Sequence, residues 1–249
     1  GDFNFLTPLH FSVQKDLLSI SQYLIEHGAI IDAISKNHLT ALHTSARNGQ
    51  IEMARMLLEK GANPNVKTLN LMTPMHFAVK FQHHDVVDLL LKDKRTTLND
   101  LNSDGFSALH VACQLGDFNI VKMLLNAGCN IHQIHSSGYT PLMLAVIEGH
   151  VDIASLLIQE GAYVNAANWK NKTALHYATE KGHIQLIDVL LNAKADANGC
   201  PKQDSSPLHI AVAYNNIEAI KFLICFQADI NISDYHQLTP LHWAIKNKY

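Results

Sequence analysis

Thr73-Pro74-Met75-His76 is one of eight copies of a four-residue motif that recurs along the chain. Successive copies begin 33 residues apart, except for one step of 34 residues between Thr73 and Ser107. The copies begin at Thr7, Thr40, Thr73, Ser107, Thr140, Thr173, Ser206 and Thr239. A fixed period of this length is typical of a solenoid, in which each repeat is a small unit that buries its apolar face against its neighbours.

The remainder of each period keeps the same register. Counted from the Thr or Ser that opens the motif, a small residue falls five positions on and two aliphatic residues fall seventeen and eighteen positions on. In the fifth repeat these are Ala145, Leu157 and Ile158, and Gly161 follows near the expected helix end. Motif and spacing together resemble the ankyrin repeat over essentially the whole chain. The resemblance implies an all-α solenoid with β-hairpin fingers.

The resemblance divides the chain into a single array, residues 1–249, whose last repeat is partial. The expected repeats are 2–34, 35–67, 68–101, 102–134, 135–167, 168–200, 201–233 and 234–249. The sequence enters a repeat almost at once, and neither end carries the polar cap that a terminal repeat normally needs. We therefore expect the chain to be a fragment of a longer protein.

Residues 135–167 illustrate how one repeat is expected to fold. Ser136-Ser137-Gly138 favours a tight turn at the tip of a finger. Thr140 caps a short helix, and the proline after it tolerates the first helical position because no N–H is needed there. A second helix is predicted over Val151–Gln159, and Gly161 supplies the left-handed residue that ends it.

Composition narrows the choice of partner. The net charge is −3 and no basic stretch exists, which argues against a nucleic-acid partner. No apolar run reaches the roughly 18–20 residues that span a bilayer, so we expect no membrane contact by this segment itself. The cysteines, Cys113, Cys129, Cys200 and Cys225, lack CxxC pairing and are interpreted as buried, reduced thiols of an intracellular, cytoplasmic protein, with Cys113 and Cys225 at helical core positions.

Sixteen histidines raise the question of a metal site. Seven occupy the fourth place of the motif: His10, His43, His76, His110, His176, His209 and His242. In ankyrin repeats this histidine links neighbouring repeats by hydrogen bonds, with the Thr three residues earlier as its partner. Met143 takes this place in the fifth repeat, where packing should replace the polar link. His132-x-x-His135 and His83-His84 have no third ligand nearby, so we expect no metal and no cofactor.

No motif of a catalytic nucleophile, a phosphate-binding loop or a zinc protease is found, and we expect no catalytic residue and no enzyme. The function indicated is a non-catalytic protein–protein interaction scaffold that binds a partner peptide or domain in its concave groove. The alternative is a regulatory ankyrin region of a larger ion channel, membrane-active toxin, enzyme or pathogen effector. The sequence that follows Tyr249 in the complete protein would discriminate the two.

The candidate partner-binding residues come from the fingers and the first helices. In the ankyrin family, the residue just before the motif and the residue eight positions into it tend to face the concave groove, where partners dock. The candidate anchors are Met72, Phe81, Phe106, Leu115, Tyr139 and Trp169. Aromatic residues and Met on an exposed groove suit a binding surface, and we expect these six to form one connected strip. The alternative is that fingers pack on one another and these side chains fill that seam.

Three helix ends depart from the family pattern. The capping glycine is replaced by Lys94, Lys194 and Gln227, and the one-residue insertion falls beside Lys94. A residue other than glycine in the left-handed conformation costs on the order of 1 kcal/mol. These helix ends should therefore fray more easily or end differently.

A smaller resemblance concerns asparagine. Asn65, Asn165, Asn198 and Asn231 each follow a Leu by eight residues, which is similar to the ankyrin context that asparaginyl hydroxylases modify. The alternative is that each side-chain amide bonds the backbone of the finger.

Overall fold

The computed structural model describes residues 5–199 and 205–247, and these residues form 15 helices and no β-strand. The chain divides into two compact units, Gly1–Asn130 (unit 1) and Ile131–Tyr249 (unit 2). None of the described helices combines the length and the apolar character that a membrane span requires.

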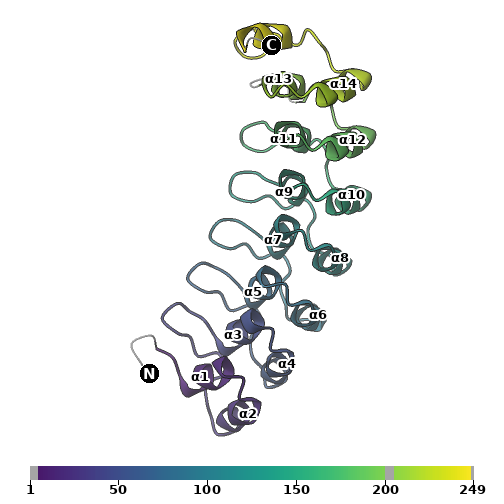
Figure 1. Cartoon of the computed structure of the whole chain (residues 1–249). Coiled ribbons are helices and arrows are strands. Elements are labelled where there is room, and N and C mark those ends of the chain that lie inside the picture. Colours follow the sequence, from purple (N-terminus) through teal and green to yellow (C-terminus); the bar gives the residue numbers. More distant parts are fainter. Residues whose placement is uncertain (1–4, 200–204, 248–249) are drawn as a thin grey trace. The chain divides into compact units, whose positions relative to one another are not determined.

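Unit 1 consists of four pairs of antiparallel helices (Figure 1). The first, inner helices of the pairs are α1 (Pro8–Gln14), α3 (Ala41–Asn48), α5 (Pro74–Lys80) and α7 (Ala108–Leu115). The second, outer helices are α2 (Leu18–Glu26), α4 (Ile51–Glu59), α6 (His84–Lys92) and α8 (Phe118–Asn126). Inner helices pack on inner helices and outer helices on outer helices, so the unit has two layers, as expected for stacked repeats.

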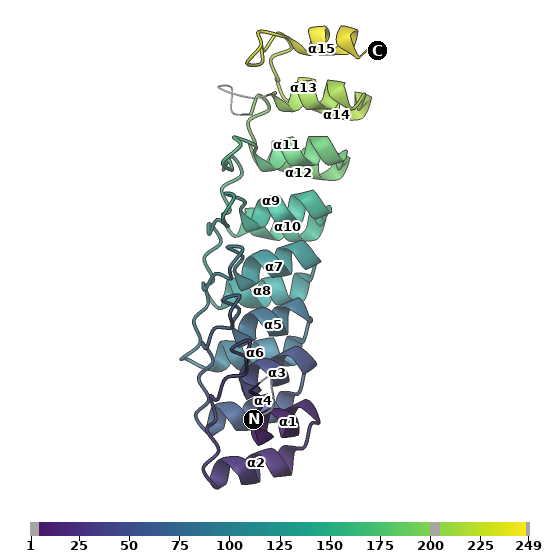
Figure 2. The same cartoon turned by 90° about the vertical axis from the view of Figure 1, so that its left-hand side faces the viewer.

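Unit 2 repeats this arrangement. Its inner helices are α9 (Pro141–Glu148), α11 (Ala174–Lys181), α13 (Pro207–Ala213) and α15 (Pro240–Lys246). Its outer helices are α10 (Val151–Gln159), α12 (Ile184–Asn192) and α14 (Ile217–Cys225). In Figure 2 the helices of each unit run across the page, and the loops that connect successive repeats lie at the same end of them.

The motif decides where each inner helix begins. Thr140 is extended (φ −93°, ψ 162°), its side chain accepts a hydrogen bond from the backbone of Met143, and Pro141 opens the helix. This is the expected N-cap, which satisfies a donor that the first turn of a helix leaves unpaired. The helix ends at Gly149, whose φ of 85° is left-handed.

The core lies between the two layers. The small residue five positions into the motif is fully buried in the central repeats, as Ser45, Ala78, Ala112, Ala145 and Ala178 show. A larger side chain here would hold neighbouring helices apart, because protein interiors are close-packed. The aliphatic positions of the outer helices fill the remaining space, and Leu57, Leu90, Leu124 and Leu157 are completely buried.

The fingers turn back on themselves as the hairpin expectation requires, but the described residues pair over too few bonds to form strands. In each finger that the structure describes in full, one backbone N–H donates to the carbonyl four residues later, for example Thr68 to Met72 at 3.0 Å and Asn102 to Phe106 at 2.9 Å. The tip needs a left-handed residue, which is Gly105 or Gly138 in two fingers and a residue such as Leu71 (φ 55°) in others. At Gly138 a side chain is also sterically excluded, because its Cβ would lie 2.8 Å from the backbone nitrogen of Trp169.

The three helix ends without glycine behave in two ways. Lys194 (φ 65°) and Gln227 (φ 64°) adopt the left-handed conformation that glycine would hold. Lys94 does not, because α6 ends at Asp93, which is already extended (φ −78°, ψ 110°). The inserted residue thus gives the third repeat a different ending.

The cysteine prediction needs one correction. Cys113 and Cys129 are buried free thiols, as expected, but Cys225 is exposed. It is the last residue of α14, whose buried side chains are Ala219 and Leu223, and helical spacing turns position 225 away from them. Cys200 lies outside the described residues.

Candidate functional site

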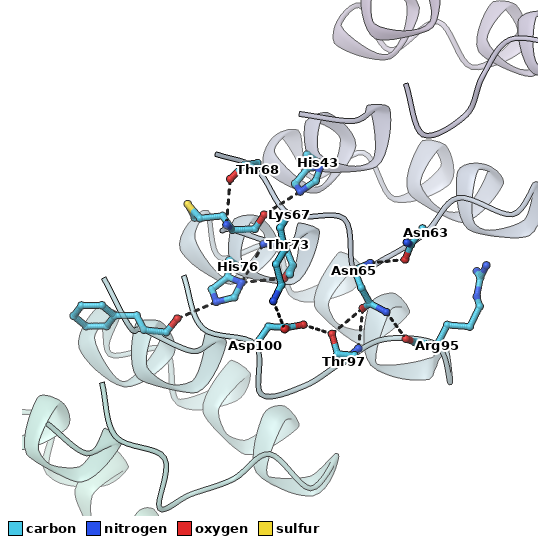
Figure 3. A network of polar contacts seen from close by, with 12 residues as sticks. His43, Asn63, Asn65, Lys67, Thr68, Thr73, His76, Arg95, Thr97 and Asp100 are labelled. Atoms are coloured by element: carbon cyan, nitrogen blue, oxygen red, sulfur yellow. Dashed lines mark hydrogen bonds and ion pairs between the residues drawn. The ribbon is translucent and has the colours of Figure 1, made fainter. Parts of the chain in front are cut away.

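Where a repeat carries the motif histidine, a buried polar seam can join that repeat to the base of the next finger, as His43 and His76 show in unit 1 (Figure 3). The backbone N–H of Thr73 donates to Nδ1 of His76 at 3.2 Å. The opposite nitrogen, Nε2, then carries the proton and donates to the Phe106 carbonyl at 3.0 Å. His43 makes the same pair of bonds, to Thr40 and to the Met72 carbonyl. The structural role predicted for the motif histidines is confirmed at these positions.

Burial keeps the imidazoles of the seam neutral. It lowers the pKa of His43 and of His176 to about 4. Burial also lowers the pKa of His76 and His209. The neutral ring is the form the seam requires, because a protonated ring would lose the acceptor that binds the Thr backbone N–H. Met143, which lacks a polar ring, is 1% exposed, so packing replaces the polar link there as predicted.

A second polar network ties the loops after the outer helices of unit 1 (Figure 3). The amide of Asn65 donates to the Arg95 carbonyl at 2.6 Å and accepts from the Thr97 backbone at 2.8 Å. Asp100 accepts from Thr97 and forms an ion pair with Lys67 at 2.7 Å. Burial would raise the pKa of Asp100, but the bonds from Lys67 and Thr97 hold it below its ordinary value.

The asparagines singled out for hydroxylation lie in these loops. Asn165 donates to the Lys194 carbonyl at 3.1 Å and accepts from the Asp196 backbone at 2.8 Å. Asn198 accepts from the Asp229 backbone at 2.7 Å. The amides of Asn65, Asn165 and Asn198 thus bond the next loop, as the structural alternative requires, whereas at Asn231 the backbone N–H donates to Asp229. Hydroxylation of the four stays a prediction, and at the first three it would require the loop bonds to open or adapt.

The finger face, defined as the surface formed by the fingers and inner helices of a unit, holds the candidate anchors. In unit 1, Phe81 and Leu115 end neighbouring inner helices, and the side chains of both are 40% exposed. Met72 and Phe106 are only half-buried, at the fingers. Their backbone carbonyls belong to the polar seam, while their side chains lie at its edge.

In unit 2 the anchors are engaged with other side chains. The Tyr139 hydroxyl accepts from Tyr177 at 3.0 Å, and Tyr177 accepts from the Asn168 amide at 2.7 Å. Burial raises the pKa of Tyr177, so the phenol remains protonated. Trp169 is 64% exposed, yet its indole N–H donates to the Ser136 carbonyl at 2.9 Å and so joins two fingers. Tyr139 and Trp169 therefore contribute to packing between neighbouring repeats, as the alternative to groove binding expects.

Two hollows open on the finger face of unit 1, and the sequence did not point to Arg47, one of the two residues that line both. One has a volume of about 470 Å³ and the other about 300 Å³, and both are lined by Leu39 and Arg47. Arg47 lies in the last turn of α3, with its guanidinium carbon 5.5 Å from the centroid of the Phe81 ring. The available signal was its position, seven residues into the motif, which faces the same groove as Phe81.

The histidines of the two clusters outside the motif have structural contacts. His83 donates from Nε2 to the Arg47 carbonyl at 2.9 Å, and His84 lies 2.9 Å from the Asp117 carboxylate. His132 stacks on the Tyr163 ring, with centroids 3.8 Å apart, and His135 accepts from the Ser137 backbone. Among the described residues, no group of three or more His, Cys, Asp or Glu side chains is arranged to hold a metal ion.

Comparison with known proteins agrees with this geometry. A family model described as ankyrin repeats (3 copies) matches residues 1–68, 67–135, 127–200 and 195–249. Among solved structures, the chain is similar to the ankyrin repeat domain of Bcl-3, a member of the IkappaB protein family. The two are 28% identical with a TM-score of 0.79, over 89% of this chain and 99% of that one.

Proposed function

The chain belongs to the ankyrin repeat family, and from that premise we propose that it is a non-catalytic scaffold whose finger face binds a peptide or domain of a partner protein. Ankyrin repeats are generally protein–protein interaction modules. The family narrows the class of function, and the partner must be argued from the surface itself.

The observation that carries the proposal is the exposure of large apolar side chains at the C-terminal ends of α5 and α7. Phe81 and Leu115 each keep 40% of their surface exposed while the small residues of the same helices are fully buried. Anchors at protein interfaces are typically aromatic or large apolar residues surrounded by polar groups. Met72 and Phe106 would extend this surface onto the fingers, and Tyr139 and Trp169 would form its counterpart in unit 2.

The test is to truncate an anchor and a matched residue elsewhere. If the Phe81 ring is a central anchor, Phe81→Ala should make the free energy of partner binding less favourable by more than about 2 kcal/mol. Tyr23→Ala, on the outer helix α2, is the control because its ring is 62% exposed. Equal capture by both variants, at unchanged melting temperature, would refute a binding role for the finger face.

Phe106 and Tyr139 allow a separate test of the alternative that these side chains only fill the space between fingers. The Phe106 ring packs edge-on against the His110 ring, with ring centroids 6.1 Å apart, and Tyr139 accepts a hydrogen bond from Tyr177. Because both are half-buried, Phe106→Ala and Tyr139→Ala should lower the melting temperature as well as capture. A lowered melting temperature with unchanged capture would assign these two residues to packing alone.

A further inference from the structure

A row of hydrogen-bond donors crosses the finger face of unit 1. The residue seven positions into the motif is Gln14 in α1, Arg47 in α3, Lys80 in α5 and Gln114 in α7. These inner helices pack side by side in that order, so equivalent positions lie along one line. No carboxylate occupies any of the four positions, and the row is therefore electropositive in a chain whose net charge is −3.

Arg47 lies in this row, and no carboxylate among the described residues is paired with its charge. Among the described residues its guanidinium forms no ion pair and no hydrogen bond, and its side chain is exposed. Its position is nevertheless fixed, because His83 bonds its backbone carbonyl at 2.9 Å and its guanidinium lies over the Phe81 ring. A planar guanidinium held on an aromatic face is pre-organised to bind a carboxylate through two N–H groups.

The hollows beside Arg47 indicate which other chemical groups a ligand should carry next to that carboxylate. The smaller hollow combines apolar side chains, Leu39, Met72 and Phe77, with polar groups of the finger tips, Asn37 and Asn70. The apolar residues suit aliphatic or aromatic side chains of a ligand, and the finger amides suit its backbone. A ligand that carries one acidic group and several apolar groups would fit these hollows. Such a ligand resembles a polypeptide more than a nucleic acid with its repeated phosphates.

We propose that the finger face of unit 1 binds an extended acidic segment of a partner protein, with one carboxylate on Arg47 and a neighbouring apolar side chain in the hollow of Leu39, Met72 and Phe77. This inference rests on the proposed function and names the chemistry of the partner. It also assigns Arg47 and Lys80 as the residues that select for negative charge.

The spacing of the helices sets the spacing of the charges. Packed helices lie about 8–10 Å apart, and an extended or polyproline-like chain rises about 3.1–3.4 Å per residue. Two acidic residues about three positions apart would therefore reach Arg47 and Lys80 together. A ligand with this pattern should bind more tightly than one with a single acidic residue.

The experiment starts from a displayed library of random linear peptides selected on the full chain. The enriched peptides should share Asp or Glu next to an apolar residue, and their synthetic forms should bind less tightly as salt is raised. Arg47→Glu should weaken binding about tenfold or more, and Arg47→Lys should lose less, because it keeps the charge without the planar fork. A peptide in which the acidic residue is replaced by Lys should regain affinity for Arg47→Glu.

Arg55→Glu is the matched control. Arg55 lies on the outer helix α4, is 48% exposed and stands 3.7 Å from Glu52, so the variant makes the same change in charge away from the finger face. Its affinity should stay within about twofold of the original chain. Equal melting temperatures of the Arg47 and Arg55 variants show that a binding defect is not a folding defect, and Arg47→Gln replaces Arg47→Glu if the latter unfolds.

The outcomes separate this inference from the proposed function. Peptides that lose affinity with Phe81→Ala but show no acidic preference, or are indifferent to Arg47→Glu, would overturn the inference and leave the finger face as a binding surface. Failure to enrich any peptide that depends on Phe81 or Arg47 would count against both. Binding of a fluorescent single-stranded oligonucleotide through Arg47, without peptide binding, would overturn the inference in favour of a nucleic-acid ligand.

Discussion

The two units are built from the same repeat, but their finger faces use polar side chains differently. In unit 1 the residues seven positions into the motif include Arg47 and Lys80, which have no ion-pair partner among the described residues. In unit 2 the same position is Ile147, Glu180, Ala213 and Lys246. Glu180 is already bonded to Lys172 at 2.7 Å, and Lys172 in turn lies over the Tyr177 ring.

This difference indicates that these polar side chains stabilise the fold in unit 2, whereas those of unit 1 are available to bind a partner. In unit 2, Lys172, Glu180, Tyr177 and Tyr139 bond or contact one another. Unit 1 leaves a guanidinium and an aromatic ring exposed together. A charge that is already paired gains little from a ligand, whereas an unpaired guanidinium offers new charge-assisted hydrogen bonds. The finger face of unit 1 is therefore the better candidate for an acidic partner.

The buried seam of unit 2 lacks a histidine in its first repeat. His43 in unit 1 and His176 in unit 2 are neutral and hydrogen-bonded, whereas Met143 fills the same position by packing. The following predictions test whether the seam is a common structural device and the finger face a local one.

Acid should destabilise both units. The pKa of His43 and of His176 is lowered to about 4, so below pH 6.5 the unfolded chain binds protons that the folded chain does not. The free energy of unfolding should fall as pH drops from about 6.5 to about 4, by on the order of 3 kcal/mol for each of these histidines. Urea unfolding followed by circular dichroism at several pH values measures this. A stability that stays constant between pH 6.5 and 5 would show that the histidines are not held neutral.

Replacing His43 by the methionine that occupies the same position in the fifth repeat should lower the free energy of unfolding. His43→Met leaves the Thr40 backbone N–H and the Met72 carbonyl without the ring that bonds them, and should cost about 2–4 kcal/mol of unfolding free energy. It should also flatten the pH dependence attributed to His43. A loss below about 0.5 kcal/mol would mean that packing alone holds the seam in unit 1, as it does at Met143.

The smallest effect distinguishes two lysines that are equivalent in sequence. Lys194→Gly should raise the free energy of unfolding by about 0.5–1 kcal/mol, because glycine relieves the left-handed strain at φ 65°. Lys94→Gly should give no such gain, because α6 ends at the extended Asp93. Thermal or urea unfolding of the two variants provides the comparison. Equal gains would mean that the third repeat ends like the others.

The sequence predicted the regular part of the molecule and missed what depends on neighbouring repeats. Thr140 and Gly161 determine local hydrogen bonds and backbone angles, so the bounds of α10 and the cap of α9 followed from the motif. The different ending at Asp93 was not specified, because an insertion can be absorbed in several ways. The contact of Arg47 with Phe81 joins residues of two repeats, and only the stacking of α3 on α5 shows it.

The sequence also could not predict which candidate anchors are exposed. Phe81 and Tyr139 both occupy predicted groove positions, yet Phe81 is exposed and Tyr139 bonds Tyr177. The two side chains lie at different places in the repeat, Phe81 at the end of an inner helix and Tyr139 in a finger, and only Tyr139 carries a hydroxyl that can bond Tyr177 of the next inner helix. Periodicity identifies a position, but its neighbour decides whether the side chain remains available.

The most direct test of the binding surface is photo-crosslinking from three exposed aromatic positions. A photoreactive phenylalanine replaces, one at a time, Phe81 on the finger face of unit 1, Tyr214 at the equivalent position of unit 2, and Tyr23 on the outer helix α2. Each variant is irradiated with the tightest acidic peptide from the selection. We expect a crosslink from position 81 and none from positions 214 and 23. A crosslink from position 214 or 23, with none from position 81, would contradict it.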